Sequence, residues 1–331
     1  RLLSPRKTVN VRKLMMKKYM KKWLLFSLTA LLLAACSLPG LGASVNNDGI
    51  VITGGTTTEM QILSYMVRGM VEHYLPDASV DMVNNLGSST LNHQAMIGGD
   101  ANVSAARYTG TSLTGELAMD PITDPTLAFE SVVKGFDDKF NQVWFPSYGF
   151  ANTYAFLVTR EFAEENNLKT VSDLAALAPN LRAGVDNSWM EREGDGYEAF
   201  KETYGFDFQR VYPMQVGLVY DALQADEMDI VLGYSTDGRI ASYDLVVLED
   251  DLQLFPPYDA SPVATKEILE AYPELEAILL KLEDTLTDEL MQAMNYEVDN
   301  DFVEAQTVAQ TFLEENNYFE DKEVTPLKER K

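Results

Sequence analysis

The sequence predicts an α/β fold in which short buried strands alternate with helices, and two observations support this. Apolar, mostly β-branched runs of strand length occur at residues 50–52, 79–83, 101–106, 154–158, 181–185 and 229–233. Apolar residues recur at helical spacing in the segments between them, at 58–74, 88–97, 171–177 and 219–223. Such alternation is typical of α/β layers with largely parallel sheets.

The helix at 58–74 has the clearest pattern. Its apolar residues recur every three or four positions and would share one face, and Pro76-Asp77 ends it. The C-terminal part differs, because 266–293 and 303–315 both read as helices with little strand between them. No internal repeat of 20–50 residues is visible.

Length and charge limit the possible functions. With 331 residues, 46% of them apolar, the chain is long enough for two lobes with full cores. Residues 1–35 contain nine Lys and Arg and no acidic residue, which leaves 17 basic against 51 acidic residues in the remainder. So acidic a surface repels phosphate backbones, and we expect no nucleic-acid partner.

Cysteine and histidine are too scarce for most reactive sites. Cys36 is the only cysteine, so neither an intrachain disulfide nor a thiolate metal cluster can form. His73 and His93 are the only histidines, and we expect structural or surface roles for both. With so few of these residues we expect no metal site. We also expect no cofactor, since the motifs Gly-x4-Gly-Lys-Ser/Thr and Gly-x-Gly-x-x-Gly, which bind ATP and dinucleotides, are absent from the sequence.

The N-terminal segment reads as a lipoprotein signal peptide. Lys21-Lys22 precede an apolar run of about 13 residues, which suits a signal-peptide core and is too short for a stable membrane-spanning helix. Leu33-Ala-Ala-Cys36 resembles a bacterial lipobox, in which the cysteine receives diacylglycerol. We therefore expect residues 1–35 to be an extension ahead of Met20 plus the signal peptide, and 36–47 to be a flexible tether lipidated at Cys36.

Four tyrosines stand beside turn-like segments and are candidates for a binding site. Tyr108 and Tyr234 each end an apolar run and begin a loop rich in Gly, Thr, Ser and Asp, which places them at the carboxyl ends of strands, where open α/β sheets bind ligands. Tyr154 follows Gly149-Phe-Ala-Asn-Thr, and Tyr258 follows Phe255-Pro-Pro. Taken singly, each is better explained as a packing or surface residue.

Several long motifs together resemble a family, the substrate-binding lipoproteins of Gram-positive osmoprotectant ABC importers for glycine betaine, carnitine and choline. The resemblance runs from about Asp48 to Phe319. The motifs are Asn85-Leu-Gly-Ser88, His93-Gln-Ala-Met-Ile-Gly-Gly-Asp100, Trp144-Phe-Pro-Ser-Tyr-Gly-Phe150, Gly184-Val-Asp-Asn-Ser-Trp189, Gly194-Asp-Gly-Tyr197, Tyr212-Pro-Met-Gln215, Tyr234-Ser-Thr-Asp-Gly-Arg-Ile240 and Phe255-Pro-Pro-Tyr258.

The resemblance implies a ligand and a set of residues that bind it. In that family four tyrosines surround a trimethylammonium group, and the matching positions are Tyr108, Tyr154, Tyr234 and Tyr258. It also implies that the Thr111 hydroxyl donates to the ligand's carboxylate. Where relatives of broad specificity have a glutamine after the first strand, this chain has Gly55, and a backbone N–H or the Thr56 hydroxyl is the possible substitute.

The physical chemistry of a quaternary ammonium agrees with such a site. This cation has no N–H to donate, and its charge is spread over methyl groups. Aromatic faces offer it both apolar contact and the negative side of the ring quadrupole.

The resemblance also implies a two-lobed, type II periplasmic-binding-protein-like fold with the ligand in a cleft between the lobes. Lobe 1 would comprise 48–145 with 250–331, and lobe 2 would comprise 146–249. The expected partners are an ABC permease and separate ATPase subunits. The receptor would be a monomer, lipid-anchored at the extracellular face of the cytoplasmic membrane.

Two other interpretations remain open at this point. A receptor of the same fold could instead be specific for choline or another compatible solute. A two-lobed enzyme is the competing class, with Asp186, Asp195 and Asp237 as candidate acids, but no nucleophile with a paired base accompanies them. The sequence therefore favours a binding protein without catalytic activity.

Overall fold

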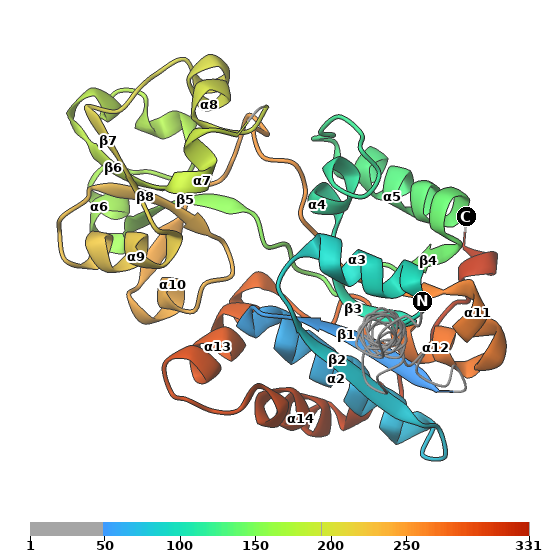
Figure 1. The fold of residues 1–331 in the computed structure, drawn as a ribbon. Helices are drawn as coiled ribbons and strands as arrows, with labels where there is room; N and C mark the ends of the chain where they lie inside the picture. Colours follow the sequence, from blue (N-terminus) through green and yellow to red (C-terminus); the bar gives the residue numbers. More distant parts are fainter. Residues whose placement is uncertain (1–48, 193, 331) are drawn as a thin grey trace, which may run out of the picture. The chain divides into compact units, whose positions relative to one another are not determined.

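The computed structural model describes residues 49–192 and 194–330 (Figure 1), so Cys36 and the predicted signal peptide and tether lie outside the described residues. The strands are β1 (Ile50–Gly55), β2 (Val80–Leu86), β3 (Val103–Tyr108), β4 (Gln142–Trp144), β5 (Tyr154–Thr159), β6 (Arg182–Asp186), β7 (Arg210–Met214), β8 (Ile230–Tyr234), β9 (Leu245–Val247) and β10 (Ala260–Thr265). The α-helices are α2 (Thr58–Tyr74), α3 (Ser89–Gly98), α4 (Thr109–Thr114), α5 (Pro125–Phe140), α6 (Arg160–Glu165), α7 (Asn187–Met190), α8 (Tyr197–Tyr204), α9 (Val216–Gln224), α10 (Arg239–Ser242), α11 (Lys266–Ala271), α12 (Glu274–Leu280), α13 (Asp288–Asp299) and α14 (Ala305–Glu315). Short 3-10 turns lie at Ser172–Leu174, Ala178–Asn180, Asn317–Phe319 and Leu327–Glu329.

The strands form two five-stranded sheets, in the orders β2-β1-β3-β10-β4 and β7-β6-β8-β5-β9. We call the elements built on the first sheet lobe 1 and those built on the second sheet lobe 2. The predicted α/β class is confirmed, but the prediction of largely parallel sheets is wrong. Parallel and antiparallel pairings are equally numerous among the described strands, because β10 and β5 each run antiparallel to both of their neighbours.

Helix α2 shows why the elements form where they do. The Thr57 side chain accepts a hydrogen bond from the Met60 backbone N–H and caps the helix. A fully buried face that includes Ile62, Leu63 and Met66 packs into the core of lobe 1. Figure 1 shows α2, α13 and α14 grouped on the first sheet, so this long helix is covered on both sides. The predicted bounds 58–74 are confirmed.

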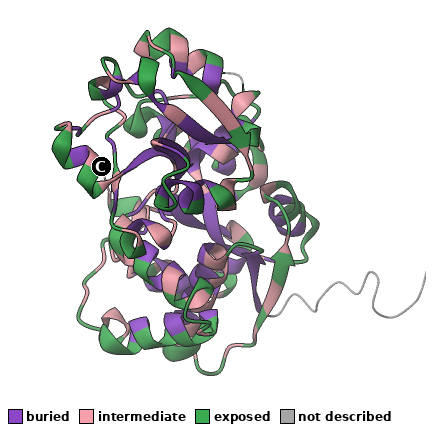
Figure 2. Cartoon of the chain, turned by 90° about the vertical axis from the view of Figure 1, so that its left-hand side faces the viewer, coloured by how far each residue is buried: buried purple, intermediate pink, exposed green. Residues whose placement is uncertain are grey.

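Lobe 2 has its own core, rich in aromatic side chains. Phe156 on β5 packs against Trp189, Phe200, Phe208 and Phe255, with ring centroids 5.1 to 6.4 Å apart. Rings at these separations add edge and stacking interactions to the area they bury. The central strands of both sheets are buried, and the exposed residues gather on helices and loops (Figure 2).

Two chain segments connect the sheets, and they are hydrogen-bonded to each other. The first runs from β4 to β5 and the second from β9 to β10. Ala151 and Asp259 form an antiparallel bridge, and the Asn152 N–H donates to the Tyr258 carbonyl over 3.2 Å. The chain thus returns to the first sheet alongside its outgoing path, which explains why β10 enters that sheet antiparallel to β3.

A second connection joins the loop after β8 to α13. The Gln292 side-chain amide donates to the Ser235 carbonyl over 2.7 Å, and the Asn295 amide donates to the Thr236 carbonyl over 2.9 Å. Gly238 packs so closely that an added Cβ would lie 2.7 Å from the backbone of Tyr296. The segment that follows Tyr234 is therefore fixed to a helix of lobe 1.

Some predicted helices differ from the structure. The helix predicted over 171–177 is wrong, because Asp173 accepts the Lys169 and Thr170 backbone N–H groups and stabilises a short 3-10 turn instead. The helix predicted over 266–293 is divided into α11, α12 and α13. Pro273, which has no N–H to donate, separates the first two. None of the described helices is both long and apolar enough to cross a membrane.

We expect Gly149→Ala to destabilise the protein strongly. Gly149 lies in the first connecting segment with a φ of 108°, and an added Cβ would lie 2.4 Å from the Leu286 carbonyl oxygen. Left-handed strain and this clash should lower the free energy of unfolding by more than about 2 kcal/mol. Thermal unfolding followed by circular dichroism measures the effect. Gly87→Ala is the control, because no heavy atom lies within 4 Å of its added Cβ. Equal melting temperatures for the two variants would contradict this account of Gly149.

Candidate functional site

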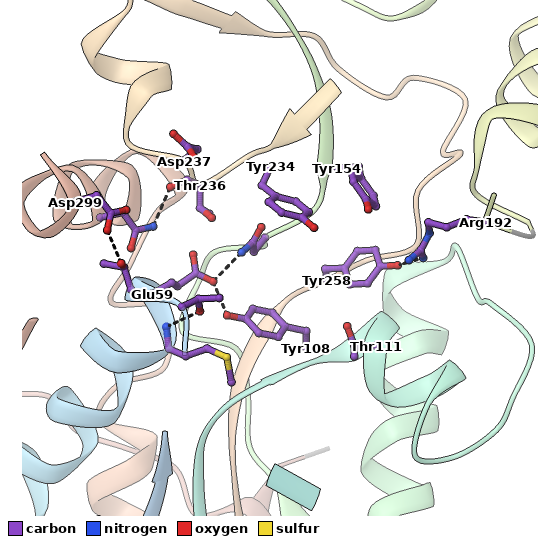
Figure 3. Close-up of a pocket in the computed structure, with 15 residues that line it drawn as sticks. Glu59, Tyr108, Thr111, Tyr154, Arg192, Tyr234, Thr236, Asp237, Tyr258 and Asp299 are labelled. Atoms are coloured by element: carbon purple, nitrogen blue, oxygen red, sulfur yellow. Dashed lines mark hydrogen bonds between the residues drawn. The ribbon is translucent and has the colours of Figure 1, made fainter. Parts of the chain in front are cut away.

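A cavity of about 360 Å³ receives side chains from both sheets and both connecting segments (Figure 3). Its lining residues are Thr57, Thr58, Glu59, Met60, Tyr108, Thr111, Asn152, Tyr154, Arg192, Tyr234, Thr236, Asp237, Tyr258, Asn295 and Asp299. Figure 3 shows the four tyrosines near the middle, with Glu59 and Asp299 on one side and Arg192 on the other. Thr111 lies on the same side as Arg192, below Tyr258. The cavity thus has an acidic side and a basic side, with aromatic rings between them.

Strand ends position three of the tyrosines. Tyr108 is the last residue of β3, and Tyr234 is the last residue of β8, as the sequence predicts. Tyr154 is the first residue of the antiparallel strand β5 and is the register partner of Tyr234. Their ring centroids lie 5.2 Å apart at an interplanar angle of 33°. The two rings of lobe 2 therefore form one continuous aromatic wall.

Backbone pairing positions Tyr258 against the start of α4. The Gly110 N–H donates to the Pro257 carbonyl over 2.9 Å, and the Thr109 N–H donates to the Asp259 carbonyl over 3.2 Å. A Cβ on Gly110 would lie 2.9 Å from the Tyr258 ring, so glycine permits this close approach. Thr111, on the first turn of α4, reaches the cavity through the same arrangement.

The tyrosines remain protonated at physiological pH. Burial raises the pKa of Tyr258 to about 12, and it raises the pKa values of Tyr108, Tyr154 and Tyr234 as well. A phenol whose pKa is raised keeps its proton, so these hydroxyls act as hydrogen-bond donors.

Arg192 supplies a positive charge to the cavity. Its Nε and Nη2 donate to the two carboxylate oxygens of Asp195 over 2.8 and 2.6 Å, and Nη2 also donates to the Tyr258 hydroxyl over 2.8 Å. The guanidinium carbon lies 5.5 Å from the centroid of the Tyr154 ring. In this structure one tyrosine ring therefore already has a cation over its face.

Glu59, near the start of α2, is a buried carboxyl in the wall of the cavity. Its Oε1 accepts the Tyr108 hydroxyl over 2.5 Å and the Asn152 amide over 3.1 Å. Its Oε2 is buried without a hydrogen-bond partner among the described residues. Burial raises the pKa of Glu59, and the hydrogen bonds from Tyr108 and Asn152 offset only part of that rise. The ionised carboxylate is therefore costly to bury at this position.

The structure brings five of the seven residues predicted for ligand binding into the cavity wall, namely Tyr108, Thr111, Tyr154, Tyr234 and Tyr258. Gly55 and Thr56 are not among the lining residues. Gly55 is buried at the end of β1 against the Met60 side chain, and Thr56 is exposed. Their predicted role stays a prediction.

Sequence reasoning missed Arg192 and Glu59, which give the cavity its two differently charged sides. The sequence signal for these two residues is weak. Glu59 follows the Gly-Thr-rich turn after β1, and Arg192 is a single base in an acidic segment, so neither belongs to a recognisable pattern of charges.

We expect the effect of Glu59→Gln on stability to depend on pH. Because the folded-state pKa is raised, ionisation of Glu59 costs folding free energy as pH rises from its ordinary value of 4.5 through the folded-state value. The melting temperature of the variant relative to wild type should therefore increase between about pH 4 and pH 8. Calorimetric scans across this range measure it, and Glu297→Gln, at an exposed position on α13, is the control. A difference that is constant or falls with pH would contradict the cost assigned to Glu59.

Comparison with known proteins identifies the family of this chain. The model of the substrate-binding domain of ABC-type glycine betaine transport systems matches residues 48–315. The carnitine transport binding protein OpuCC of Listeria monocytogenes is 51% identical, over 93% of this chain and all of the relative. The ergothioneine transport permease/ergothioneine binding protein EgtU of Helicobacter pylori is 32% identical, over 82% of this chain and 48% of that protein.

A solved structure agrees with these sequence matches. The crystal structure of a glycine betaine/carnitine/choline ABC transporter has a TM-score of 0.80 and 54% identity, covering 82% of this chain and all of that one. The predicted two-lobed, type II periplasmic-binding-protein-like fold is thereby confirmed. The chain belongs to the family of substrate-binding domains of ABC-type glycine betaine transport systems.

Proposed function

We propose that the protein is an extracellular receptor that captures a zwitterionic quaternary ammonium, such as glycine betaine or carnitine, and delivers it to an ABC permease driven by separate ATPase subunits. The observation that carries the proposal is the cavity in which Tyr108, Tyr154, Tyr234 and Tyr258 come together from two sheets and a connecting segment. The relatives named for carnitine transport and for glycine betaine, carnitine and choline support this ligand class.

The energetics of a tyrosine cage suit this ligand. A ring face over a desolvated cation contributes about 0.5 to 2 kcal/mol, so four rings supply several kcal/mol. Micromolar affinity corresponds to about 8 kcal/mol. The difference must come from the other end of the ligand and from apolar contact with the methyl groups.

The basic side of the cavity suits the carboxylate. Thr111 offers a hydroxyl donor, and Arg192 offers a guanidinium whose side chain is 37% exposed. A carboxylate is attracted by the guanidinium and accepts hydrogen bonds from either group. The ligand would then lie with its ammonium among the rings and its carboxylate toward Thr111 and Arg192. Choline, which lacks a carboxylate, is the alternative ligand and would gain nothing from Arg192.

The division into lobes explains how binding is coupled to closure. We place lobe 1 at residues 48–145 with 250–331 and lobe 2 at residues 146–249. Tyr108, Thr111 and Tyr258 then come from lobe 1, and Tyr154 and Tyr234 come from lobe 2. A ligand touched by both lobes binds the closed arrangement better than an open one and so stabilises it.

The proposed attachment to the membrane rests on the lipobox-like Leu33–Cys36. We propose that the receptor is a monomer, anchored by a lipid on Cys36 at the outer face of the cytoplasmic membrane.

Cys36→Ala should incorporate no labelled fatty acid and should leave the membrane fraction or remain unprocessed. A variant that is labelled and fractionates as wild type does would refute the anchor.

We expect each cage residue to contribute to affinity. Replacement of Tyr108, Tyr154, Tyr234 or Tyr258 by Ala should weaken glycine betaine binding by about 1 to 2 kcal/mol, or about 5- to 30-fold. Tyr234→Phe should weaken glycine betaine binding less than Tyr234→Ala does, because the ring face is retained. Isothermal titration calorimetry and melting temperatures, measured together, separate lost contacts from lost folding.

The control for the cage is Tyr243→Ala, since the Tyr243 hydroxyl bonds to Asp221 and this tyrosine does not line the cavity. Its affinity for glycine betaine should equal that of wild type. The cage assignment fails if two or more of the four cage variants bind as tightly as wild type. If wild-type protein binds no quaternary ammonium at all, the proposed function itself fails.

Thr111→Asp tests which side of the cavity receives the carboxylate. An acidic side chain there should repel glycine betaine and carnitine, because two like charges placed together cost several kcal/mol when desolvated, but it should leave choline binding intact. The expected result is a loss of about 10-fold or more for the two zwitterions. Equal losses for all three ligands would show that Thr111 is only a structural residue.

A further inference from the structure

Buried carboxyl groups accept hydrogen bonds from the hydroxyls of three of the four tyrosines of the cavity. The Tyr108 hydroxyl donates to Glu59 over 2.5 Å, the Tyr154 hydroxyl donates to Asp186 over 2.8 Å, and the Tyr258 hydroxyl donates to Asp195 over 3.3 Å. The three acids come from α2, from the end of β6 and from the segment after α7, and each is at most 4% exposed.

The fourth tyrosine is connected to the same network. The ring of Tyr234 lies against the ring of Tyr154, with the two centroids 5.2 Å apart. Tyr154 in turn donates to Asp186. All four phenols thus connect, directly or through one neighbour, to a buried acid.

We propose that Glu59, Asp186 and Asp195 are positioning residues that orient three of the four phenol rings, and that the unpaired carboxylates of Asp186 and of ionised Glu59 give the cavity a negative potential, so that the site selects a cationic head group over a neutral one of the same shape. This inference rests on the proposed function and adds the acids to it. Two of the three, Asp186 and Asp195, do not line the cavity, so they act through the tyrosines.

The hydrogen bonds have two physical consequences. A phenol that donates to a carboxylate is held in one orientation, because its O–H must point at the acid. The negative charge behind the ring also adds to the negative face of the ring quadrupole, to which a cation is attracted. In the low dielectric of a closed cavity such a charge acts over several ångströms.

An acid in the second layer suits a zwitterion better than an acid in the cavity wall. A carboxylate touching the ligand would repel the ligand's own carboxylate, and it has no N–H to accept from a quaternary ammonium. Asp186 avoids both problems, because it does not line the cavity and reaches it only through the Tyr154 hydroxyl.

The acids also differ in how their charges are balanced. Asp195 is paired with Arg192 at 2.6 Å, so its charge largely cancels the guanidinium that lies over Tyr154. Among the ion pairs of the described residues, neither Glu59 nor Asp186 has a basic partner. Asp186 is therefore the clearest residue on which to test the effect of charge.

The test is Asp186→Asn, which keeps an oxygen to accept the Tyr154 hydroxyl but removes the charge. Two probes are titrated by NMR into wild type and variant. Tetramethylammonium is the cation without a carboxylate, and 3,3-dimethylbutanoate has the shape of glycine betaine with a neutral head. We expect about five- to tenfold weaker binding of the cation and of glycine betaine, and less than a twofold change for the neutral-headed probe.

A matched control is Asp207→Asn. Asp207 also accepts a tyrosine hydroxyl in lobe 2, that of Tyr197, but neither residue lines the cavity. This variant should shift the melting temperature only. Glu59→Gln is the second test variant, from lobe 1, titrated at about pH 8 to favour the ionised carboxylate in wild type. It decides the matter if Asp186→Asn does not fold.

Several results would overturn the inference. Binding of tetramethylammonium within twofold of wild type in both acid variants would do so, as would equal losses for the cation and the neutral-headed probe. Wild-type protein that binds 3,3-dimethylbutanoate as tightly as glycine betaine would show that the cavity does not select charge. Wild-type protein that binds neither tetramethylammonium nor glycine betaine would instead refute the proposed function.

Discussion

The structure depends on the pairing of the two segments that connect the sheets. Because the bridge between Ala151 and Asp259 holds these segments side by side, the start of β5 and the start of β10 are fixed close to each other. Tyr154 begins β5, and Tyr258 lies two residues before β10. One short stretch of backbone pairing therefore brings together residues that are about a hundred positions apart in the sequence, and with them two of the four rings.

The loop after β8 adds a second constraint of a different kind. There, side-chain amides of α13 hold backbone carbonyls of Ser235 and Thr236, and all the groups involved are buried. Buried amide hydrogen bonds are costly to break without a replacement. Any relative motion of the lobes must either break these hydrogen bonds or pivot about this contact, where Gly238 packs against Tyr296. Tyr234 sits one residue before this loop, so the chain directly after it is hydrogen-bonded to α13.

Local signals in the sequence were sufficient for the central elements. The bounds of α2 follow from its apolar spacing and the Thr57 cap, and the ends of β3 and β8 follow from buried runs that stop at Gly- and Ser-rich loops. Helix α5, which is absent from the predicted elements, also has a local sequence signal, since Asp124 caps it and Pro125 begins it. The direction of β10 could not be read locally, because it depends on the path of the chain through lobe 2.

The site was predictable to the extent that its residues end strands or stand in family motifs. Tyr108 and Tyr234 could be placed from strand ends alone, whereas Tyr258 needed the resemblance. Glu59 and Arg192 could not be found, because in a chain with 51 acidic residues a single charge has no pattern. Glu59 is distinguished by its burial, and both residues are distinguished by the tyrosine hydroxyl that each one contacts. Only the tertiary structure supplies these features.

The small helix α4 has a consequence for how such receptors diversify. Helix α4 has six residues, includes Thr111 and lies between β3 and α5. Arg192 likewise lies outside the strands that hold Tyr154 and Tyr234, in the segment after α7. A substitution at Thr111 can alter the polar end of the pocket without replacing a tyrosine of the cavity or a residue of either core. A gene duplicate could thus acquire a new cargo through a few substitutions, without passing through an unstable intermediate.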